Sequence, residues 1–265
     1  MKPRRSIFYF LLCLFLHPVF YPEACAWRQE DNPPAKPPGI RCLLLGGYAA
    51  ICQPNGKLSE DYGTFGEAGG SILYLTKKRL LIGLEGGFIF GGNVLKDPVP
   101  NLRNPDGSIN GADGRDAVFK VYQRGSNVPA LRVGYMLPIR WPMAEKNTFG
   151  GYSLSAGCSW FRNYTYIEDI SKKTPQFSDQ YRIGYDRLVT GPAFGFWIGY
   201  LYMPENNLLN LMLEAGYMTG FTKTARYSFP TQEPAGVSRR DDVFQLRLKL
   251  YFTIRSRDEN TIYYY

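Results

Sequence analysis

The sequence predicts an all-β protein, a membrane-spanning antiparallel up-and-down β-barrel of about eight strands. Three observations predict this fold class: a secretory signal at the N-terminus, recurrent segments in which apolar and polar residues alternate, and connections that alternate between short and long. With 265 residues, of which 45% are hydrophobic, the chain is long and apolar enough to form a folded domain.

Residues 1–26 have the three parts of a secretory signal, which are a positively charged start, an apolar stretch over 7–16 and small residues before a cleavage point at Ala26. Such a signal predicts export from the cytoplasm, and together with the barrel pattern described below it predicts the outer membrane of a Gram-negative cell. Lipidation of Cys25, as the first residue of a lipoprotein, is the alternative to cleavage after Ala26. The Pro-rich segment 27–39 is expected to be a lead-in to the first strand.

Beyond residue 39, the chain repeats a run of about ten residues with period-two alternation, which is the pattern of a strand with one apolar and one polar face. In the clearest run, Leu246, Leu248 and Leu250 lie on one face, and Arg247 and Lys249 lie on the other. The eight runs cover approximately 40–50, 64–75, 80–91, 128–138, 148–162, 189–202, 208–224 and 242–254.

The connections between these runs alternate in length. Thr76–Arg79 is a short turn, whereas the connection over 92–127 is the longest in the chain. Short turns at one end and long loops at the other are typical of outer-membrane barrels, and a soluble β-sandwich predicts no such alternation. We therefore expect a barrel over 40–254 and a C-terminal extension over 255–265. A further pair of strands within 92–127 would raise the count to ten.

If the apolar face of each run meets lipid, the alternation determines which side chains face the interior. Three acids and three bases have the inward phase and predict a charge-paired lumen: Glu67, Glu85, Arg132, Glu214, Arg247 and Lys249. Because an eight-stranded barrel is filled by its own side chains, a packed polar plug is expected, and an ion or proton path is the alternative. Inward glycines such as Gly195 and Gly216 are expected to make room for Trp197.

The residues that usually support catalysis are few. His17 is the only histidine and lies in the signal, so Ser-His, Cys-His and zinc-His chemistry is not expected in the mature chain. Cys42, Cys52 and Cys158 have neither the spacing of a zinc site nor the even number of a disulfide framework. We expect no enzyme activity, no metal and no cofactor, and nucleic acid is not expected as a partner.

Two loops contain candidate binding residues. In the longest connection, four side chains could offer oxygens to calcium: Asp106, Asn110, Asp113 and Asp116. Their spacing differs from that of a regular calcium loop, and consecutive tight turns are favoured. A later loop is rich in residue types enriched at protein interfaces, and its possible partner contacts are Tyr181, Arg182, Tyr185 and Arg187. An ordinary polar loop is the alternative there.

The signal, the Pro-rich lead-in, the glycine-aromatic strand 65–70 and the loop ending at 184–188 resemble small outer-membrane barrels of Bacteroidota. Within that group, the chain looks most like the accessory barrels associated with type IX secretion. The resemblance implies a non-enzymatic structural or docking component of an envelope complex, with lipoproteins or translocon components of the secretion machinery as partners beside outer-membrane lipid. The alternative functions are a small-solute or ion pore and, third, a lipid-modifying enzyme. One departure from the family is that 255–265 follows the last expected strand.

Overall fold

The computed structural model describes residues 41–137, 148–171, 174–177, 179–204 and 208–255. The expected signal and lead-in, and the extension beyond Arg255, lie outside these residues.

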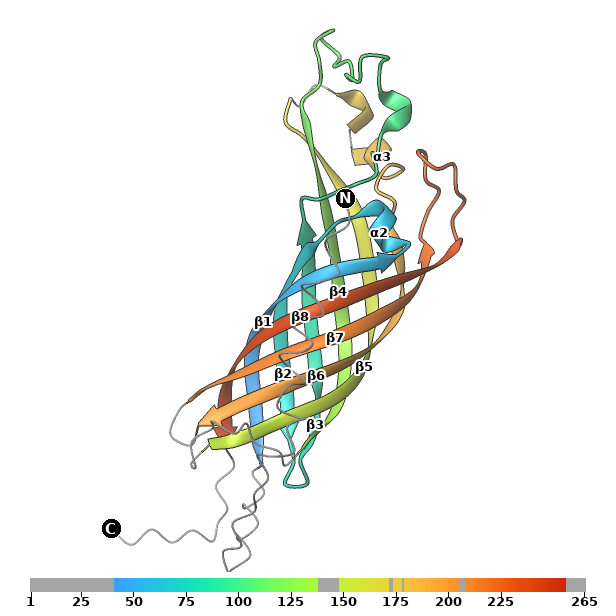
Figure 1. Cartoon of the computed structure of the whole chain (residues 1–265). Coiled ribbons are helices and arrows are strands. Elements are labelled where there is room, and N and C mark those ends of the chain that lie inside the picture. The colour runs from blue at the N-terminus through green and yellow to red at the C-terminus, as the bar shows by residue number, and fades with distance from the viewer. Residues whose placement is uncertain (1–40, 138–147, 172–173, 178, 205–207, 256–265) are drawn as a thin grey trace, which may run out of the picture. The chain divides into compact units, whose positions relative to one another are not determined.

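The described residues form a closed antiparallel barrel in which each strand pairs with the next along the chain (Figure 1). The first and last strands also pair, from Cys42 with Arg255 to Gly56 with Asp241, so the barrel has no unpaired edge. The predicted all-β, eight-stranded up-and-down architecture is therefore confirmed. The strands are β1 (Cys42–Gly56), β2 (Phe65–Leu75), β3 (Leu80–Gly91), β4 (Phe119–Met136), β5 (Thr148–Asp169), β6 (Val189–Pro204), β7 (Leu209–Thr224) and β8 (Ser238–Arg255).

The hairpin of β4 and β5 is much longer than the sequence predicts. Pairing continues out to Phe119 with Asp169, whereas the expected runs covered 128–138 and 148–162. Where a hairpin leaves the closed barrel, neither of its faces has to be apolar, so the alternation that marks the other strands fades. Residues 92–118 contain a short 3-10 helix and one internal bridge and no further pair of strands, so the ten-strand alternative is wrong.

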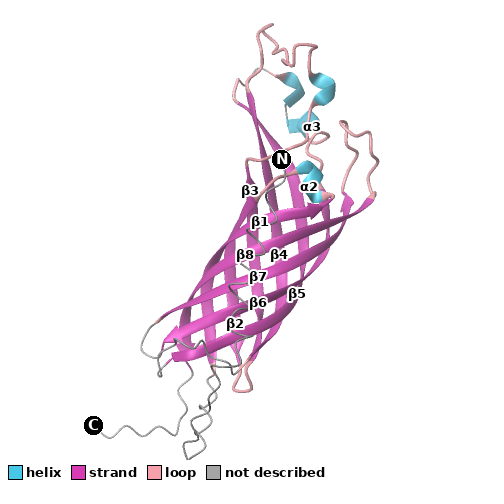
Figure 2. Ribbon diagram, viewed as in Figure 1, coloured by secondary structure: helices cyan, strands magenta, loops and turns pink. Residues whose placement is uncertain are grey.

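The two ends of the barrel differ. Residues 76–79 join β2 to β3 at one end, here called the turn end. The opposite end, here called the loop end, carries the longer connections 57–64, 92–118, 170–188 and 225–237. The short helices also lie at the loop end (Figure 2): α2 (Leu58–Asp61), η3 (Pro100–Leu102), η4 (Pro175–Phe177) and α3 (Asp179–Arg182). None of the helices in the described part of the chain is long and apolar enough to cross a membrane.

The outside of the barrel wall is apolar. Along β8, Arg247 and Lys249 are buried, whereas Leu248 and Leu250 are exposed. The same alternation on the other strands exposes Ile72, Ile82, Leu84, Phe88, Leu131, Val133, Phe196, Ile198 and Leu211. The wall therefore turns its apolar side chains outward and its charges inward, the reverse of a soluble barrel.

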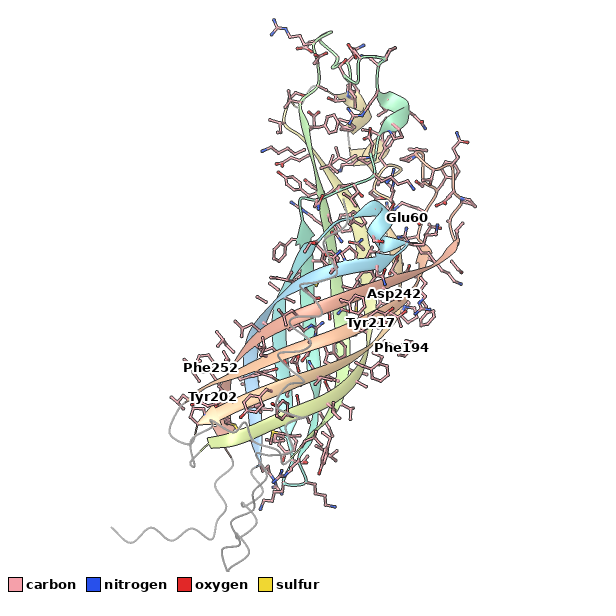
Figure 3. All side chains as sticks on the ribbon, viewed as in Figure 1. Glu60, Phe194, Tyr202, Tyr217, Asp242 and Phe252 are labelled. Atoms are coloured by element: carbon pink, nitrogen blue, oxygen red, sulfur yellow. The ribbon has the colours of Figure 1, made fainter. Side chains whose placement is uncertain are left out.

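Aromatic side chains are found toward both ends of this apolar wall. Phe252 and Tyr202 lie toward the turn end, and Phe194 and Tyr217 lie nearer the loop end (Figure 3). Rows of aromatics at two levels are typical of a protein that crosses two membrane–water interfaces.

Candidate functional site

The six charged residues expected in the lumen lie together in one layer inside the barrel, here called the charged layer. The acids come from β2, β3 and β7 and the bases from β4 and β8, and every member is at most 7% exposed. The members are Glu67, Glu85, Arg132, Glu214, Arg247 and Lys249. They come together because each has the inward phase of its strand and because the strand registers bring them to a similar level.

Every acid in the charged layer is ion-paired. Arg132 contacts Glu85 at 2.8 Å and also contacts Glu214. Lys249 lies 2.8 Å from Glu214 and 2.5 Å from Glu85. Arg247 lies 3.0 Å from Glu85 and 3.7 Å from the remaining acid of the layer, on β2. Three acids therefore balance three bases, and removal of any one member would leave the layer with an unbalanced buried charge.

Trp197 lies beside the arginines of this layer. The guanidinium carbons of Arg132 and Arg247 are 4.9 Å and 4.8 Å from the centroid of its ring, within cation–π range. The indole N–H donates a hydrogen bond to Gln245 Oε1 at 3.1 Å. A Cβ atom added to Gly216 would come within 2.0 Å of the ring, so only glycine leaves room for the indole.

Neutral polar side chains complete the layer, and sequence reasoning missed Tyr48 and Ser155 among them. The Tyr48 hydroxyl donates to Glu67 Oε1 at 2.7 Å, and the Gln245 amide donates to the other oxygen of this carboxylate at 2.9 Å. Ser155 Oγ accepts from Arg132 Nε at 3.1 Å. Each of these residues has the inward phase of its strand, so the same alternation could have identified them.

Apolar side chains fill the barrel on both sides of the charged layer. The cluster toward the turn end consists of Cys42, Leu44, Leu73, Leu75, Leu81, Met136, Leu201, Met203, Met212 and Tyr251. The cluster toward the loop end consists of Ala50, Cys52, Leu58, Tyr62, Phe65, Ile89, Phe161, Ala193, Met218 and Val243. A cavity beside the charged layer measures only about 10 Å³, roughly the space of one water molecule. The described interior is therefore a filled core.

The loop end is closed by α2, which the sequence did not predict. Leu58, the first residue of the helix, and Tyr62, directly after it, are buried in the cluster toward the loop end. The Tyr62 hydroxyl is also hydrogen-bonded to Thr165 Oγ1 on β5 at 2.8 Å. These contacts hold the connection between β1 and β2 across the mouth of the barrel.

Asp61, the last residue of α2, joins the other loops to this cap. Its carboxylate lies 2.9 Å from Arg239 Nη1, 3.8 Å from Arg187 Nη1 and 3.9 Å from Lys96 Nζ. Its backbone oxygen accepts a hydrogen bond from the Leu95 amide at 2.9 Å. Through these contacts, Asp61 links the four long connections, or the strands that flank them, to one another.

Arg187 lies in the predicted loop, but its side chain is enclosed by neighbouring loops. Its side chain is only 8% exposed, and its Nη2 donates to the backbone oxygen of Asp97 at 2.6 Å. Its other terminal nitrogen, Nη1, lies 3.8 Å from Asp61, so the side chain links these loops to one another. The expectation of a surface contact for a partner does not hold for Arg187, because a charged residue on a loop can be recruited by a distant acid that no local pattern reveals.

The other three candidate contacts remain near the surface. Tyr181 is 60% exposed. Arg182 lies over the ring of Tyr166, with 5.0 Å between the guanidinium carbon and the centroid. Tyr185 packs edge-on against Phe229, with ring centroids 5.2 Å apart, and partial burial raises the pKa of its hydroxyl.

Two loop carboxylates have shifted pKa values of opposite sign. Burial raises the pKa of Asp186 above its ordinary value, although Arg226 lies 3.1 Å away and opposes the shift. Partial burial also acts to raise the pKa of Asp97, but hydrogen bonds from Arg103 and from the Val99 amide outweigh burial and hold that pKa below its ordinary value.

The candidate calcium loop is built of tight turns. Asp106 Oδ1 accepts a hydrogen bond from the Ser108 amide at 2.9 Å, and Asp113 Oδ1 accepts one from the Arg115 amide at 3.2 Å. Among the residues that the structure describes, no group of three or more His, Cys, Asp or Glu side chains is arranged to hold a metal ion. The three described cysteines form no disulfide, and two of them are buried.

No family model and no curated protein matches this chain. Among solved structures, it is similar to Neisserial surface protein A, with 13% identity, coverage of 79% of this chain and 96% of that one, and a TM-score of 0.39. It is also similar to the outer membrane protein OprG of Pseudomonas aeruginosa (13% identity, 82% and 97% coverage, TM-score 0.36) and to the attachment invasion locus protein Ail of Yersinia pestis (12%, 82% and 99%, 0.32). The strand pairing described above, and not these similarities, defines the fold.

Proposed function

We propose that the protein is an outer-membrane barrel that does not conduct and that acts through its loop end as a structural or docking component of an envelope protein complex. The observation that carries this proposal is the interior, in which a balanced charged layer lies between two apolar clusters. A barrel filled in this way has its accessible chemistry on its loops and turns.

The apolar wall supports placement in a membrane. Phe88 is 71% exposed, Leu84 52% and Leu250 51%, and they belong to a surface that continues around the strands. Soluble monomers rarely expose contiguous apolar patches of such extent, whereas hydrocarbon accepts them. An even number of strands, with short turns at one end and long loops at the other, is the pattern of outer-membrane barrels, and it directs the loop end outward.

The pore and enzyme alternatives have less support. Conduction requires a continuous wet path, and the charged layer leaves space beside it for roughly one water. A lipid-modifying enzyme needs a base that works near neutral pH, and the only histidine of the chain lies in the expected signal.

The loop end offers a surface that lipid does not require. The loop-end aromatic surface, as we call it, consists of four side chains that are 41% to 60% exposed: Tyr181, Ile183, Tyr227 and Phe229. They come from two connections joined by a hydrogen bond from the Phe229 amide to the backbone oxygen of Gly184 at 2.9 Å. Exposed aromatics on a tethered loop pair are typical of protein contact surfaces.

The resemblance to accessory barrels of type IX secretion suggests a more specific form of the same role. In that form, the partner is a lipoprotein or a translocon component of the secretion machinery. The identity of the partner protein tests this form separately from the docking role.

The docking role is tested by placing a photo-cross-linking amino acid at Tyr181 in the native cells, with the same substitution at lipid-facing Leu250 as the matched control. We expect a discrete protein adduct from position 181 and only lipid adducts from position 250. Equal absence of protein adducts at both positions would contradict docking.

Conduction is tested with the purified barrel in a planar bilayer. No stable porin-sized steps are expected from the wild-type protein. Reproducible large steps would favour the pore, and time-dependent turnover of phospholipid or lipopolysaccharide would favour the enzyme.

A further inference from the structure

The outward face of the β4–β5 hairpin changes character where the hairpin leaves the barrel. Toward the turn end, its outward side chains continue the apolar wall, and Val128, Leu131 and Trp160 are all exposed. Toward the loop end, its outward side chains are polar, basic or aromatic, and we call them the rim face. They form four cross-strand pairs: Ser126 with Arg162, Arg124 with Tyr164, Tyr122 with Tyr166, and Lys120 with Glu168. Both strands change at the same level, so the rim face begins where the apolar wall ends.

The opposite face of this part of the hairpin is already packed. Ile167 of β5 is fully buried in a cluster with Val99, Ile109 and Phe177 of the neighbouring loops. The basic side chains of the rim face, by contrast, are exposed. The rim face is therefore the side of the hairpin that a ligand can reach.

Two arginines of the rim face lean away from the apolar wall. The guanidinium carbon of Arg162 lies 5.5 Å from the centroid of the Tyr164 ring, and that of Arg124 lies 3.9 Å from the centroid of the Tyr166 ring. In each case the tyrosine belongs to the next pair toward the loop end. Arginines at a membrane surface extend in this way, because the aliphatic stem stays on apolar surface while the charge reaches the level of the head groups. The cation–π contacts hold both charges at that level.

Nearby acids do not neutralise these two arginines. Glu168 lies directly opposite Lys120, so these two charges of the rim face offset each other. Asp186 is near enough to Arg162 to be affected by its charge, but the ion pair of Asp186 is with Arg226, at 3.1 Å. The rim face therefore keeps a net positive charge.

The same two arginines keep their hydrogen-bond donors. In the described part of the chain, neither Arg124 nor Arg162 forms an ion pair or donates a hydrogen bond from its side chain. Each guanidinium has five N–H groups in a planar fork that matches the oxygens of a phosphate. The two residues are diagonal neighbours on adjacent strands, which places them roughly 7–8 Å apart. They can therefore bind one phosphate together, or two phosphates of one head group.

We propose that the rim face binds the phosphate groups of the glycolipid that forms the outer leaflet of a Gram-negative outer membrane. Arg124 and Arg162 donate to the phosphate oxygens, and the tyrosine rings beside them pack against the sugars. The apolar wall directly below contacts the acyl chains of the same molecule. A lipid is favoured over a protein because the rim face continues directly into the lipid-facing wall, so its ligand meets a basic and an apolar surface at once. The proposal rests on the outward orientation of the loop end, which is part of the proposed function, and not on docking.

Native mass spectrometry of the purified barrel in detergent tests the chemistry with two probes, lipid A that carries two phosphates and the same lipid A without phosphates. We expect the wild type to bind the phosphorylated form at least about tenfold more tightly, since each charge-assisted hydrogen bond strengthens binding. The double variant Arg124→Gln, Arg162→Gln removes both charges and keeps long side chains. It should lose most of this preference while it stays folded, as judged by heat-modifiable migration on gels.

The matched control is Arg240→Gln. Arg240 is also an exposed, outward arginine near the loop end, but it lies on β8 and is paired with Asp242 at 3.0 Å. This variant should keep the preference of the wild type. The comparison of the two lipids on wild-type protein does not depend on the folding of any variant. Equal binding of the two lipids by the wild type, or an undiminished preference in the folded double variant, would overturn the proposal.

A second arm places a photo-cross-linking amino acid at Tyr122, on the rim face, in the native cells. We expect adducts with the outer-leaflet glycolipid. Protein adducts without glycolipid would overturn the proposal in favour of a protein partner, and adducts with phospholipid alone would overturn the outward orientation on which it rests. Docking is measured by the separate cross-link at Tyr181, so a failure of docking and a failure of glycolipid binding give different results.

Discussion

Arg239 Nη1 lies 2.9 Å from Asp61 Oδ2, although the two residues are 178 positions apart in the chain. The contact joins the helix that caps the barrel mouth to the start of the last strand. Because Arg239 also pairs with Asp241 on its own strand, the link is held in a fixed position.

Replacement of Asp61 by asparagine should loosen the loop end without unfolding the barrel. The loss of a charge-assisted hydrogen bond is worth about 1.5–3 kcal/mol, and partial solvent exposure of Arg239 places this case at the lower end. We expect protease cleavage within the loops to become about tenfold faster, with little change in the midpoint of global unfolding. Glu60→Gln is the control, since Glu60 makes only an exposed pair with Lys57. Equal cleavage rates in both variants would disprove the role of Asp61.

The second prediction concerns the charged layer. Glu85→Gln removes the acid that contacts all three bases of the layer. Removal of one partner from a buried ion pair is expected to lower the free energy of unfolding by about 3–5 kcal/mol. The measurement is urea unfolding in lipid vesicles. Adding Lys249→Met restores the balance of charge and should recover most of the loss, and a double variant no more stable than the single one would argue against charge balance.

A third prediction concerns the apolar wall. Leu248 is 46% exposed at the middle of β8, so Leu248→Arg places a charge against lipid. A basic residue at mid-membrane on the lipid face destabilises a barrel by about 2–4 kcal/mol, and we expect a markedly lower folding yield in vesicles. Val118→Arg is the matched control, because Val118 is 56% exposed but precedes β4 at the loop end. Indistinguishable yields would show that the wall does not face lipid.

Acid should open the 92–118 loop. The pKa of Asp97 is held below its ordinary value, so its carboxylate stabilises the loop fully above the unfolded pKa of about 3.9 and loses this effect as the pH falls through the folded value. Hydrogen exchange at the Val99 amide, which donates to Asp97, should therefore accelerate in acid beyond the intrinsic rate. Asp97→Asn should abolish this pH dependence. Asp186, whose pKa is raised, acts in the opposite direction in its own loop.

The barrel and its interior could be read from the sequence because both follow from one period. Glu67 and Glu214 are 147 positions apart, and each was placed inside by the residues immediately beside it. Strand register then brought them to one level without any further signal. The apolar clusters follow the same rule, since Leu44 and Leu73 also have the inward phase of their strands.

The loop end could not be predicted in this way. Leu58 and Tyr62 lie in a connection without periodicity, and their burial depends on the open mouth that they cover. Asp61 and Arg187 meet only after the barrel has closed, so no local pattern pairs them.

The pairing of β8 with β1 bears on how the barrel is assembled. Two of the three bases in the charged layer, Arg247 and Lys249, belong to the last strand. Before that strand is in place, three carboxylates share Arg132 alone, and an interior with such an excess of negative charge stays hydrated. Drying of the core is thus coupled to arrival of the C-terminal strand. We therefore expect a seven-stranded form to stay hydrated, and the core to dry only when the seam closes.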